Sequence, residues 1–326
     1  MHVRKLGDAG PASKPIGLGT LALTGRSGPV DDATGIETIR FALDIGVTLI
    51  DAVAGDDVAR AERLVGRAVA GRRGEAVIAT SGGFRPAHGG RGTRLDGTPG
   101  HLRRSCDASL ERLGVDHIDI YYLAGVDPRV PVEESMGELA GLVASGKVRW
   151  VGLSGASAEQ LRRAHAVHPV AALAAEYSLW ERRVEAECLP VARERGVAVF
   201  ACRPLGRGFL TGRIRSAAQL AAGDARHGDP RFRPENLPGN VRLLRAAEEM
   251  AAHRDVGLAR LALAWLLCRG DDITPVPSTR DRLHLEMNAA AAEIRLTAAE
   301  CDHLAALFPP ASIAGAPPPG PAPPSS

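Results

Sequence analysis

The chain has 326 residues, of which 45% are apolar, enough for one large α/β barrel or two smaller domains with full cores. Its 40 basic and 38 acidic residues leave a net charge of +2, so neither nucleic acid nor an anionic membrane is expected as a partner. The five cysteines are widely spaced and include no CxxC pair, which argues against a disulfide framework and against a metal site.

Neither a secretory signal nor a membrane span is expected from the sequence. The first residues, MHVRKLGDAG, lack the apolar segment of a secretory signal, and no run of about 18 apolar residues predicts a transmembrane helix. The expected compartment is therefore the cytoplasm. A monomer is expected, because no strongly apolar exposed helix face is evident.

Short apolar runs alternate with longer amphipathic stretches along the chain. The predicted strands are residues 15–23, 47–51, 75–80, 117–123, 149–154, 171–176, 197–202 and 273–277. The predicted helices are residues 33–45, 60–71, 99–113, 133–145, 157–166, 183–195, 239–253 and 257–268. About eight strand–helix units predict a (β/α)8 barrel. A doubly wound sheet is the alternative, but it would favour a G-x-G-x-x-G turn, and the sequence contains none.

The structure of several segments outside this repeat can also be predicted. Residues 3–10 are expected to form a small hairpin across the barrel bottom. The insert 82–97, rich in Gly and Arg, follows the third strand and is either a cationic lid over an acidic substrate or a solvated loop. Residues 213–240 predict a long loop. A single domain is predicted over 1–308, followed by a Pro-rich disordered tail at 309–326.

Motifs over nearly the whole chain resemble those of the aldo-keto reductase family. They are residues 16–23 (IGLGTLAL), 42–52 (ALDIGVTLIDA), 109–123 (SLERLGVDHIDIYYL), 146–157 (GKVRWVGLSGAS), 176–180 (EYSLW), 204–212 (PLGRGFLTG), 261–267 (LALAWLL) and 275–291 (PVPSTRDRLHLEMNAAA). The resemblance implies a barrel that transfers hydride from NADPH to a carbonyl. In that family a tyrosine donates the proton, a lysine paired with an aspartate lowers the tyrosine's pKa, and a histidine orients the substrate.

Three of those four catalytic positions differ in this sequence. The family aspartate is retained as Asp51, but Asp56 stands at the tyrosine position. Ser81 stands at the lysine position, and Ala124 at the histidine position. These side chains cannot take the same roles, since alanine is apolar, serine carries no charge and aspartate is normally ionised.

The resemblance also assigns a cofactor site, which is altered in part. Its candidates are Ser154, Leu205, Gly206, Arg207, Gly208, Arg280 and Asn288. The glycines and amides of residues 204–212 suit a phosphate. Gly155 and Ala174 stand where the family holds the nicotinamide with longer polar side chains. Asp281 should repel the 2′-phosphate of NADPH. Whether NADPH still binds is therefore left open.

The candidate catalytic groups are Asp51, Asp56 and Ser81. If the two carboxylates share a pocket, one pKa should rise and give an acid or base near neutral pH; the alternative is that Asp56 lies on a wet loop. Ser81 either orients substrate or fills space. The candidate substrate-binding residues are Ala124, Trp180, Cys202 and Arg203. Cys202 is either a thiol activated by Arg203 or a small buried residue.

The expected partner is a small-molecule substrate, and three functions remain open at this stage. The favoured one is non-redox acid/base chemistry, such as dehydration, isomerisation or cyclisation, with Asp51 and Asp56 as acid and base. The second is a catalytically inert binding or regulatory protein. The third is an unconventional NAD(P)H-dependent oxidoreductase acting on a carbonyl.

Overall fold

The structure is a computed structural model that describes residues 3–25, 30–53, 57–86 and 93–316. Eight parallel strands form one sheet in the order β12-β11-β10-β9-β8-β5-β4-β3. They are β3 (Leu18–Gly19), β4 (Leu49–Asp51), β5 (Val77–Gly82), β8 (Ile118–Ala124), β9 (Val148–Ser154), β10 (Val170–Glu176), β11 (Ala198–Cys202) and β12 (Ile273–Val276). Each overlaps one of the predicted strands.

The first and last strands meet and close the sheet. A parallel bridge joins Gly19 to Ser278. The Gly17 amide donates to the Pro275 carbonyl, and the Gly19 amide donates to the Pro277 carbonyl, each at 3.0 Å. The predicted (β/α)8 barrel is thereby confirmed.

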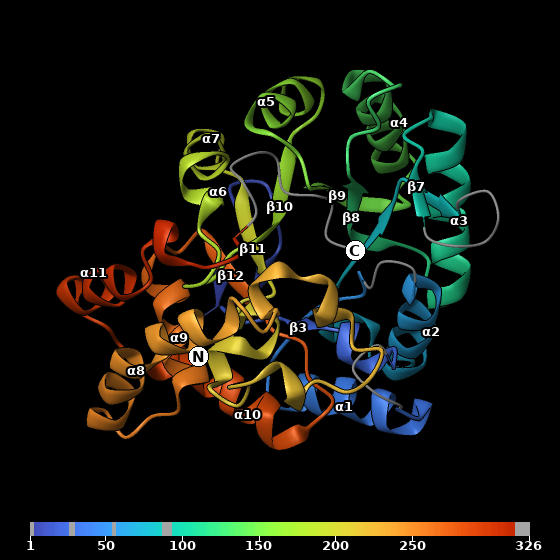
Figure 1. Cartoon of the computed structure of the whole chain (residues 1–326). Helices are drawn as coiled ribbons and strands as arrows, with labels where there is room; N and C mark the ends of the chain where they lie inside the picture. Colours follow the sequence, from blue (N-terminus) through green and yellow to red (C-terminus); the bar gives the residue numbers. More distant parts are fainter. Residues whose placement is uncertain (1–2, 26–29, 54–56, 87–92, 317–326) are drawn as a thin grey trace.

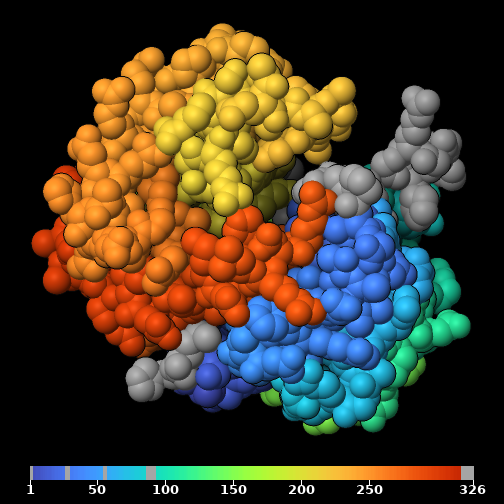
Figure 2. All heavy atoms as spheres, turned by 90° about the horizontal axis from the view of Figure 1, so that it is seen from below, coloured from blue at the N-terminus to red at the C-terminus, as the bar shows by residue number. Residues whose placement is uncertain are grey.

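Helices surround the barrel on its outside (Figure 1). They are α1 (Asp32–Asp44), α2 (Val58–Val69), α3 (Pro99–Leu113), α4 (Val132–Ala144), α5 (Ala158–Val167), α6 (Arg183–Ala186), α7 (Leu189–Glu194), α8 (Leu237–His253), α9 (Leu258–Cys268), α10 (Arg282–Ala290) and α11 (Ala298–Leu307). None of them is long and apolar enough to cross a membrane, within the part of the chain that the structure describes. On the face in Figure 2 the C-terminal segments, in orange to red, lie against the blue N-terminal part, where Arg282 of α10 pairs with Glu37 of α1 at 2.9 Å.

Two helices are absent from the sequence prediction. α10 is short, and α11 has almost no amphipathic periodicity. A usable signal for α11 was its capping box, in which Thr297 accepts from the Glu300 amide while the Glu300 carboxylate accepts from the Thr297 amide.

Segments outside the repeat differ in part from expectation. The N-terminal hairpin is confirmed as β1 (Arg4–Lys5) paired with β2 (Ala12–Ser13), and the Asp8 amide donates to the Gly196 carbonyl just before β11. The insert after β5 contains a second hairpin, β6 (Phe84–Pro86) with β7 (Thr93–Leu95).

The packed chain also extends past the predicted boundary at residue 308. Ile313 is buried, and the Ala314 amide donates to Asn240 Oδ1 at 2.9 Å. The predicted long loop at 213–240 contains three short 3-10 helices, and α8 begins inside it at Leu237. Residues 317–326 of the predicted tail lie outside the described residues.

The barrel interior is filled by inward-facing side chains from alternate positions of the strands. Leu49, Ala79, Ile120, Tyr122, Ala172, Ala174, Ala198, Phe200 and Val276 form this inner cluster, which Leu6 of the N-terminal hairpin joins. A larger cluster lies between the strands and the helices. Both clusters are well packed, so adding one methyl group where two elements approach closely should lower the stability of the fold.

We predict opposite effects for two helical glycines. In α2, a Cβ on Gly66 would run into the backbone of Leu113 at the end of α3, whereas nothing lies within 4 Å of a Cβ on Gly137 in α4. Gly66→Ala should therefore lower the free energy of unfolding by about 1–3 kcal/mol through overpacking. Gly137→Ala should raise it by about 0.5–1 kcal/mol, because alanine favours the helix. Urea denaturation measures both. Equal effects would mean that α2 and α3 do not approach as described.

Candidate functional site

Side chains at the carboxyl ends of the strands converge on the barrel mouth. Leu49, Ala79, Tyr122, Ala174 and Phe200 face the interior. Since side chains alternate along a strand, the residues two positions later face the same way. Those residues are Asp51, Ser81, Ala124, Glu176 and Cys202. On β9, Ser154 lies four residues after the inward-facing Trp150 and therefore faces the same way. Active sites of such barrels lie at this face.

Asp51 is a buried carboxyl at this mouth. It is 5% exposed, and one carboxylate oxygen accepts from the Val53 amide at 3.0 Å. The Thr20 hydroxyl donates to the Asp51 carbonyl and so holds its backbone. Burial raises the pKa of Asp51 to about 7, which the single amide bond only partly offsets. No ion pair to Asp51 occurs among the described residues, where Ser81 stands at the end of the neighbouring strand β5.

Two further groups near Asp51 stay uncharged. The Tyr122 ring is fully buried, and its hydroxyl has no hydrogen-bond partner among the residues that the structure describes. Burial and then the Asp51 carboxylate raise the pKa of Tyr122. The same two causes raise the pKa of the Cys202 thiol. Cys202 is therefore a neutral thiol, which argues against the activated nucleophile considered from the sequence.

Sequence reasoning missed Tyr122 as a site residue. It lies one inward position before Ala124 and in register with Ser81 and Gly152. A Cβ on Gly152 would clash with the Tyr122 ring, so glycine leaves the room that the ring needs. The alternation of β8 could have placed Tyr122 inside the barrel, but only the structure shows that its hydroxyl is left unpartnered.

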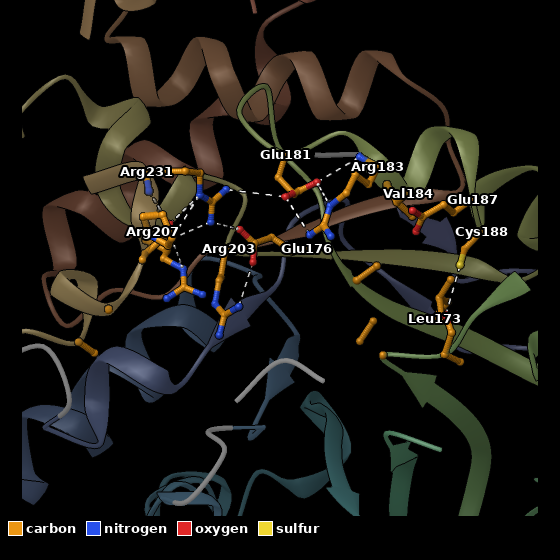
Figure 3. A pocket seen from close by; sticks show the side chains of 18 residues that line it. Leu173, Glu176, Glu181, Arg183, Val184, Glu187, Cys188, Arg203, Arg207 and Arg231 are labelled. Carbon is orange, nitrogen blue, oxygen red and sulfur yellow. Dashed lines mark hydrogen bonds and ion pairs between the residues drawn. The ribbon is translucent and has the colours of Figure 1, made fainter. Parts of the chain in front are cut away.

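A pocket of about 360 Å³ opens beside the mouth, between the ends of β9 and β10, α6 and the loop after β11. At its polar end Glu176 accepts from Arg203 Nη1 at 2.9 Å and from Arg231 Nη2 at 3.0 Å (Figure 3). Arg231 also donates to Asp229 at 2.8 Å. Burial alone would raise the pKa of Glu176, but Arg231 and Arg203 hold it below its usual value.

The four consecutive cofactor candidates lie in the turn after β11. Gly206, Arg207 and Gly208 have φ of 57°, 56° and 91° in succession, directly after Leu205. The Gly206 amide donates to the Arg203 carbonyl at 2.8 Å and the Gly208 amide to the Leu205 carbonyl at 3.0 Å, and the two glycines leave the turn open to close approach by a ligand. Ser154 is buried at the end of β9.

The remaining cofactor candidates lie across the seam of the barrel. Arg280 lines a hollow with Asp31, Thr34 and Asp281. Asn288 is buried in α10. The Asp281 carboxylate caps α10 by accepting from the His284 amide at 3.0 Å, so its negative charge lies at the helix N-terminus.

The structure thus brings some predicted residues together and separates others. Asp51, Ser81, Ala124, Ser154 and Cys202 share the mouth, while Arg203 and Arg207 line the adjoining pocket. Trp180 does not line that pocket.

Trp180 is buried instead. Its ring stacks on the Phe209 ring with the two ring centroids 3.9 Å apart, and the Arg231 guanidinium lies 4.7 Å from the Trp180 ring centroid. Asp56 lies outside the described residues. Within the described ranges no group of three metal-ligating side chains occurs.

Comparison with known proteins gives a consistent result. The model of the aldo/keto reductase family matches residues 15–308. "Probable aldo-keto reductase 1" of Glycine max is 36% identical over 313 residues, covering 95% of this chain and 90% of the relative.

Solved structures agree with this match. The glycerol dehydrogenase AKR11B4 from Gluconobacter oxydans superposes with a TM-score of 0.86 and 29% identity, covering 94% of this chain and 96% of that one. An aldo/keto reductase from Klebsiella pneumoniae, solved in complex with NADP and acetate, has a TM-score of 0.72 and 26% identity, covering 94% and 95%. The barrel, the motifs in order and the full-length match together show that this chain belongs to the aldo/keto reductase family.

Proposed function

We propose that this chain is an NAD(P)H-dependent oxidoreductase of small carbonyl compounds in which the Asp51 carboxyl donates the proton. The observation that carries the proposal is the position of this carboxyl, buried at the barrel mouth without a cationic partner among the described residues. The relatives favour this function over dehydration, isomerisation or cyclisation, which the sequence alone had favoured.

The described residues fit a dinucleotide at its phosphate end. The turn after Leu205 contains two glycines, Gly206 and Gly208, which would let a pyrophosphate approach the backbone closely. The hollow at Arg280 is open to an adenosine moiety. At the nicotinamide end, the Ser154 hydroxyl could hydrogen-bond the carboxamide, and Gly155 and Ala174 leave space for the ring because their side chains are small. The cofactor, when bound, would supply the hydride.

Asp51 suits the proton step because its pKa lies near neutral pH. Its protonated form donates to the substrate oxygen as negative charge develops there, and solvent then restores the proton. Tyr122 and Cys202 remain neutral beside it and therefore add no competing charge. In the oxidative direction the ionised carboxylate accepts the alcohol proton.

We expect Asp51→Asn to lower kcat by about 10²–10⁴ without changing cofactor affinity, since general acid catalysis contributes that much. The assay follows NADPH and NADH oxidation at 340 nm with small aldehydes and ketones, and calorimetry measures cofactor affinity. In the wild type, kcat should fall as pH rises above about 7, because Asp51 then ionises. This fall of kcat with rising pH should be absent in Asp51→Asn.

Asp56→Asn is the comparison variant, because Asp56 is the other candidate acid from the sequence. A large kcat loss in Asp56→Asn with wild-type kcat in Asp51→Asn would move the proton-donor role to Asp56. Absence of binding by both NADPH and NADH up to millimolar concentration would end the oxidoreductase proposal.

Asp51→Asn should also change the pH dependence of stability. The folded pKa of about 7 lies above the usual 3.8, so the wild type loses stability as pH rises through this window. Relative to wild type, Asp51→Asn should gain up to about 4 kcal/mol of unfolding free energy at pH 8 and almost nothing at pH 4. Denaturant titrations at both pH values measure this.

Asp127→Asn provides a control of opposite sign. The Arg129 side chain holds the pKa of Asp127 down at about 2, so its contribution to stability is present above the usual pKa. Asp127→Asn should therefore lose stability at neutral pH. An Asp51→Asn variant that is equally stable relative to wild type at pH 4 and pH 8 would mean that Asp51 titrates normally.

Cofactor preference should depend on Asp281. Its carboxylate at the start of α10 repels a 2′-phosphate, so NADH should bind at least as tightly as NADPH. Asp281→Asn keeps a side-chain oxygen for the His284 amide and removes the charge. It should tighten NADPH binding several-fold and leave NADH binding unchanged, as measured by calorimetry at low salt. Equal changes for both cofactors would place the 2′-phosphate elsewhere.

A further inference from the structure

The Tyr122 hydroxyl is a buried donor that lacks an acceptor. Its ring is fully buried in the barrel interior, and the hydroxyl makes no hydrogen bond with any residue that the structure describes. The ring packs edge-on against Phe200, with the two ring centroids 6.3 Å apart, and lies where a side chain on Gly152 would otherwise be. These contacts hold the ring in place, so the hydroxyl stays in the interior. A buried hydroxyl without a partner destabilises a fold, which points to a role for it in the site.

The Asp51 carboxylate shows the opposite deficit. An ionised carboxylate can accept about four hydrogen bonds, but among the described residues Asp51 accepts one, from the Val53 amide at 3.0 Å. The neighbouring Thr20 hydroxyl donates to the Asp51 backbone carbonyl instead. No cation in the described part of the chain pairs with this carboxylate. Once ionised, Asp51 is therefore short of hydrogen-bond donors.

The strand between these two groups does not screen them from each other. β5 lies between β4 and β8 in the sheet, and its inward residues Ala79 and Ser81 are in register with Asp51 and Tyr122. Both of these side chains are short. The Asp51 carboxylate accordingly acts on the tyrosine, since after burial it is the largest cause that raises the pKa of Tyr122. A donor without an acceptor and a carboxylate short of donors thus share one part of the interior.

The other ionisable groups around Asp51 offer it no comparable donor. Cys202 of β11 also lies beside the carboxylate, but a thiol is only a weak hydrogen-bond donor. Glu176 at the end of β10 is an acceptor and is already engaged in ion pairs. The residues of β9 and β12 in the interior cluster, Trp150 and Val276, are not ionisable. The tyrosine hydroxyl is therefore the strongest donor among the ionisable groups of the described interior.

We propose that Tyr122 is a positioning residue for the proton donor: its hydroxyl donates a hydrogen bond, directly or through one water molecule, to the Asp51 carboxylate that forms when the proton leaves. The role in reduction rests on the oxidoreductase function proposed above, whereas the hydrogen bond does not. As the carbonyl carbon receives hydride, the Asp51 O–H bond breaks and its proton goes to the substrate oxygen. Tyr122 keeps its own proton, because its pKa is raised. Negative charge thus grows on Asp51 where a hydroxyl dipole stabilises it.

The first test measures stability and needs no turnover. Tyr122→Phe removes the hydroxyl and keeps the ring. At pH 4 Asp51 is protonated, so loss of an unpartnered hydroxyl should leave the folding equilibrium constant unchanged or raise it. At pH 9 Asp51 is ionised, and Tyr122→Phe should lower this constant about tenfold or more relative to wild type, because a hydrogen bond to a charged group is lost. Urea denaturation of the full chain at both pH values measures these effects.

Tyr121→Phe is the matched control, because this neighbouring buried tyrosine has Ser109 and Glu62 beside its hydroxyl instead of Asp51. Its effect on stability should be the same at pH 4 and pH 9. In an Asp51→Asn background, Tyr122→Phe should likewise have the same effect at both pH values. An equal effect of Tyr122→Phe at pH 4 and pH 9 in the wild-type background, or a pH-dependent loss that persists without the Asp51 carboxyl, would overturn the proposal.

The second test follows reduction of small aldehydes by NADPH and NADH. Tyr122→Phe should lower kcat about three- to tenfold, since a less stabilised carboxylate makes Asp51 a weaker acid, and should leave KM and cofactor affinity within about twofold. The fall of kcat with rising pH should move about 1–2 pH units higher. A wild-type kcat profile in Tyr122→Phe would refute the positioning role. If the wild type reduces no aldehyde, the oxidoreductase proposal fails, and the stability test alone decides the hydrogen bond to Asp51.

Discussion

The closed parallel barrel imposes one constraint on everything at its mouth. Each strand presents alternate side chains inward, and closure leaves no other direction for them to face. The last inward residue of each strand therefore meets the same small volume, whatever its chemistry. Asp51 is buried there because Leu49 below it belongs to the interior cluster. Desolvation of its carboxyl follows from strand geometry, and the raised pKa follows from desolvation.

The ion-pair network around Glu176 links the loop after β11 to the barrel. Arg231 contacts Glu176 and Asp229 through its polar side and the Trp180 ring through its face. Trp180 in turn stacks on Phe209 in the turn that carries Arg207. Polar and aromatic contacts thus hold the turn after β11 and the pocket lined by Glu176 and Arg231 in one arrangement, so a change in Arg231 would disturb both.

The fold was predictable because its signals are local and repeated. Buried parallel strands read as short apolar runs, and family-like motifs occur in order from residue 16 to 291. Helix α11 was missed because its sequence has a capping box but almost no hydrophobic periodicity.

The site was less predictable because it depends on contacts between distant segments. The sequence identified Asp51, Arg203 and Arg207 but not their surroundings. Tyr122 belongs to the site because the folded barrel brings β8 close to Asp51. Arg231 belongs to it because a loop 55 residues beyond Glu176 folds back onto Glu176. Trp180 shows the converse, since an aromatic residue expected in the pocket instead packs behind it.

The seam between the first and last strands has a further consequence. Pro275 and Pro277 accept hydrogen bonds from Gly17 and Gly19, but proline has no amide hydrogen to return. The prolines therefore remove backbone donors from the last strand, and fewer hydrogen bonds hold β12 to β3 than a ladder without proline would provide. The hollow lined by Asp31, Thr34, Arg280 and Asp281 spans this joint, with residues from both ends of the fold. A ligand bound in this hollow would contact residues on both sides of the seam. Its binding would therefore raise the free energy of unfolding of the whole barrel.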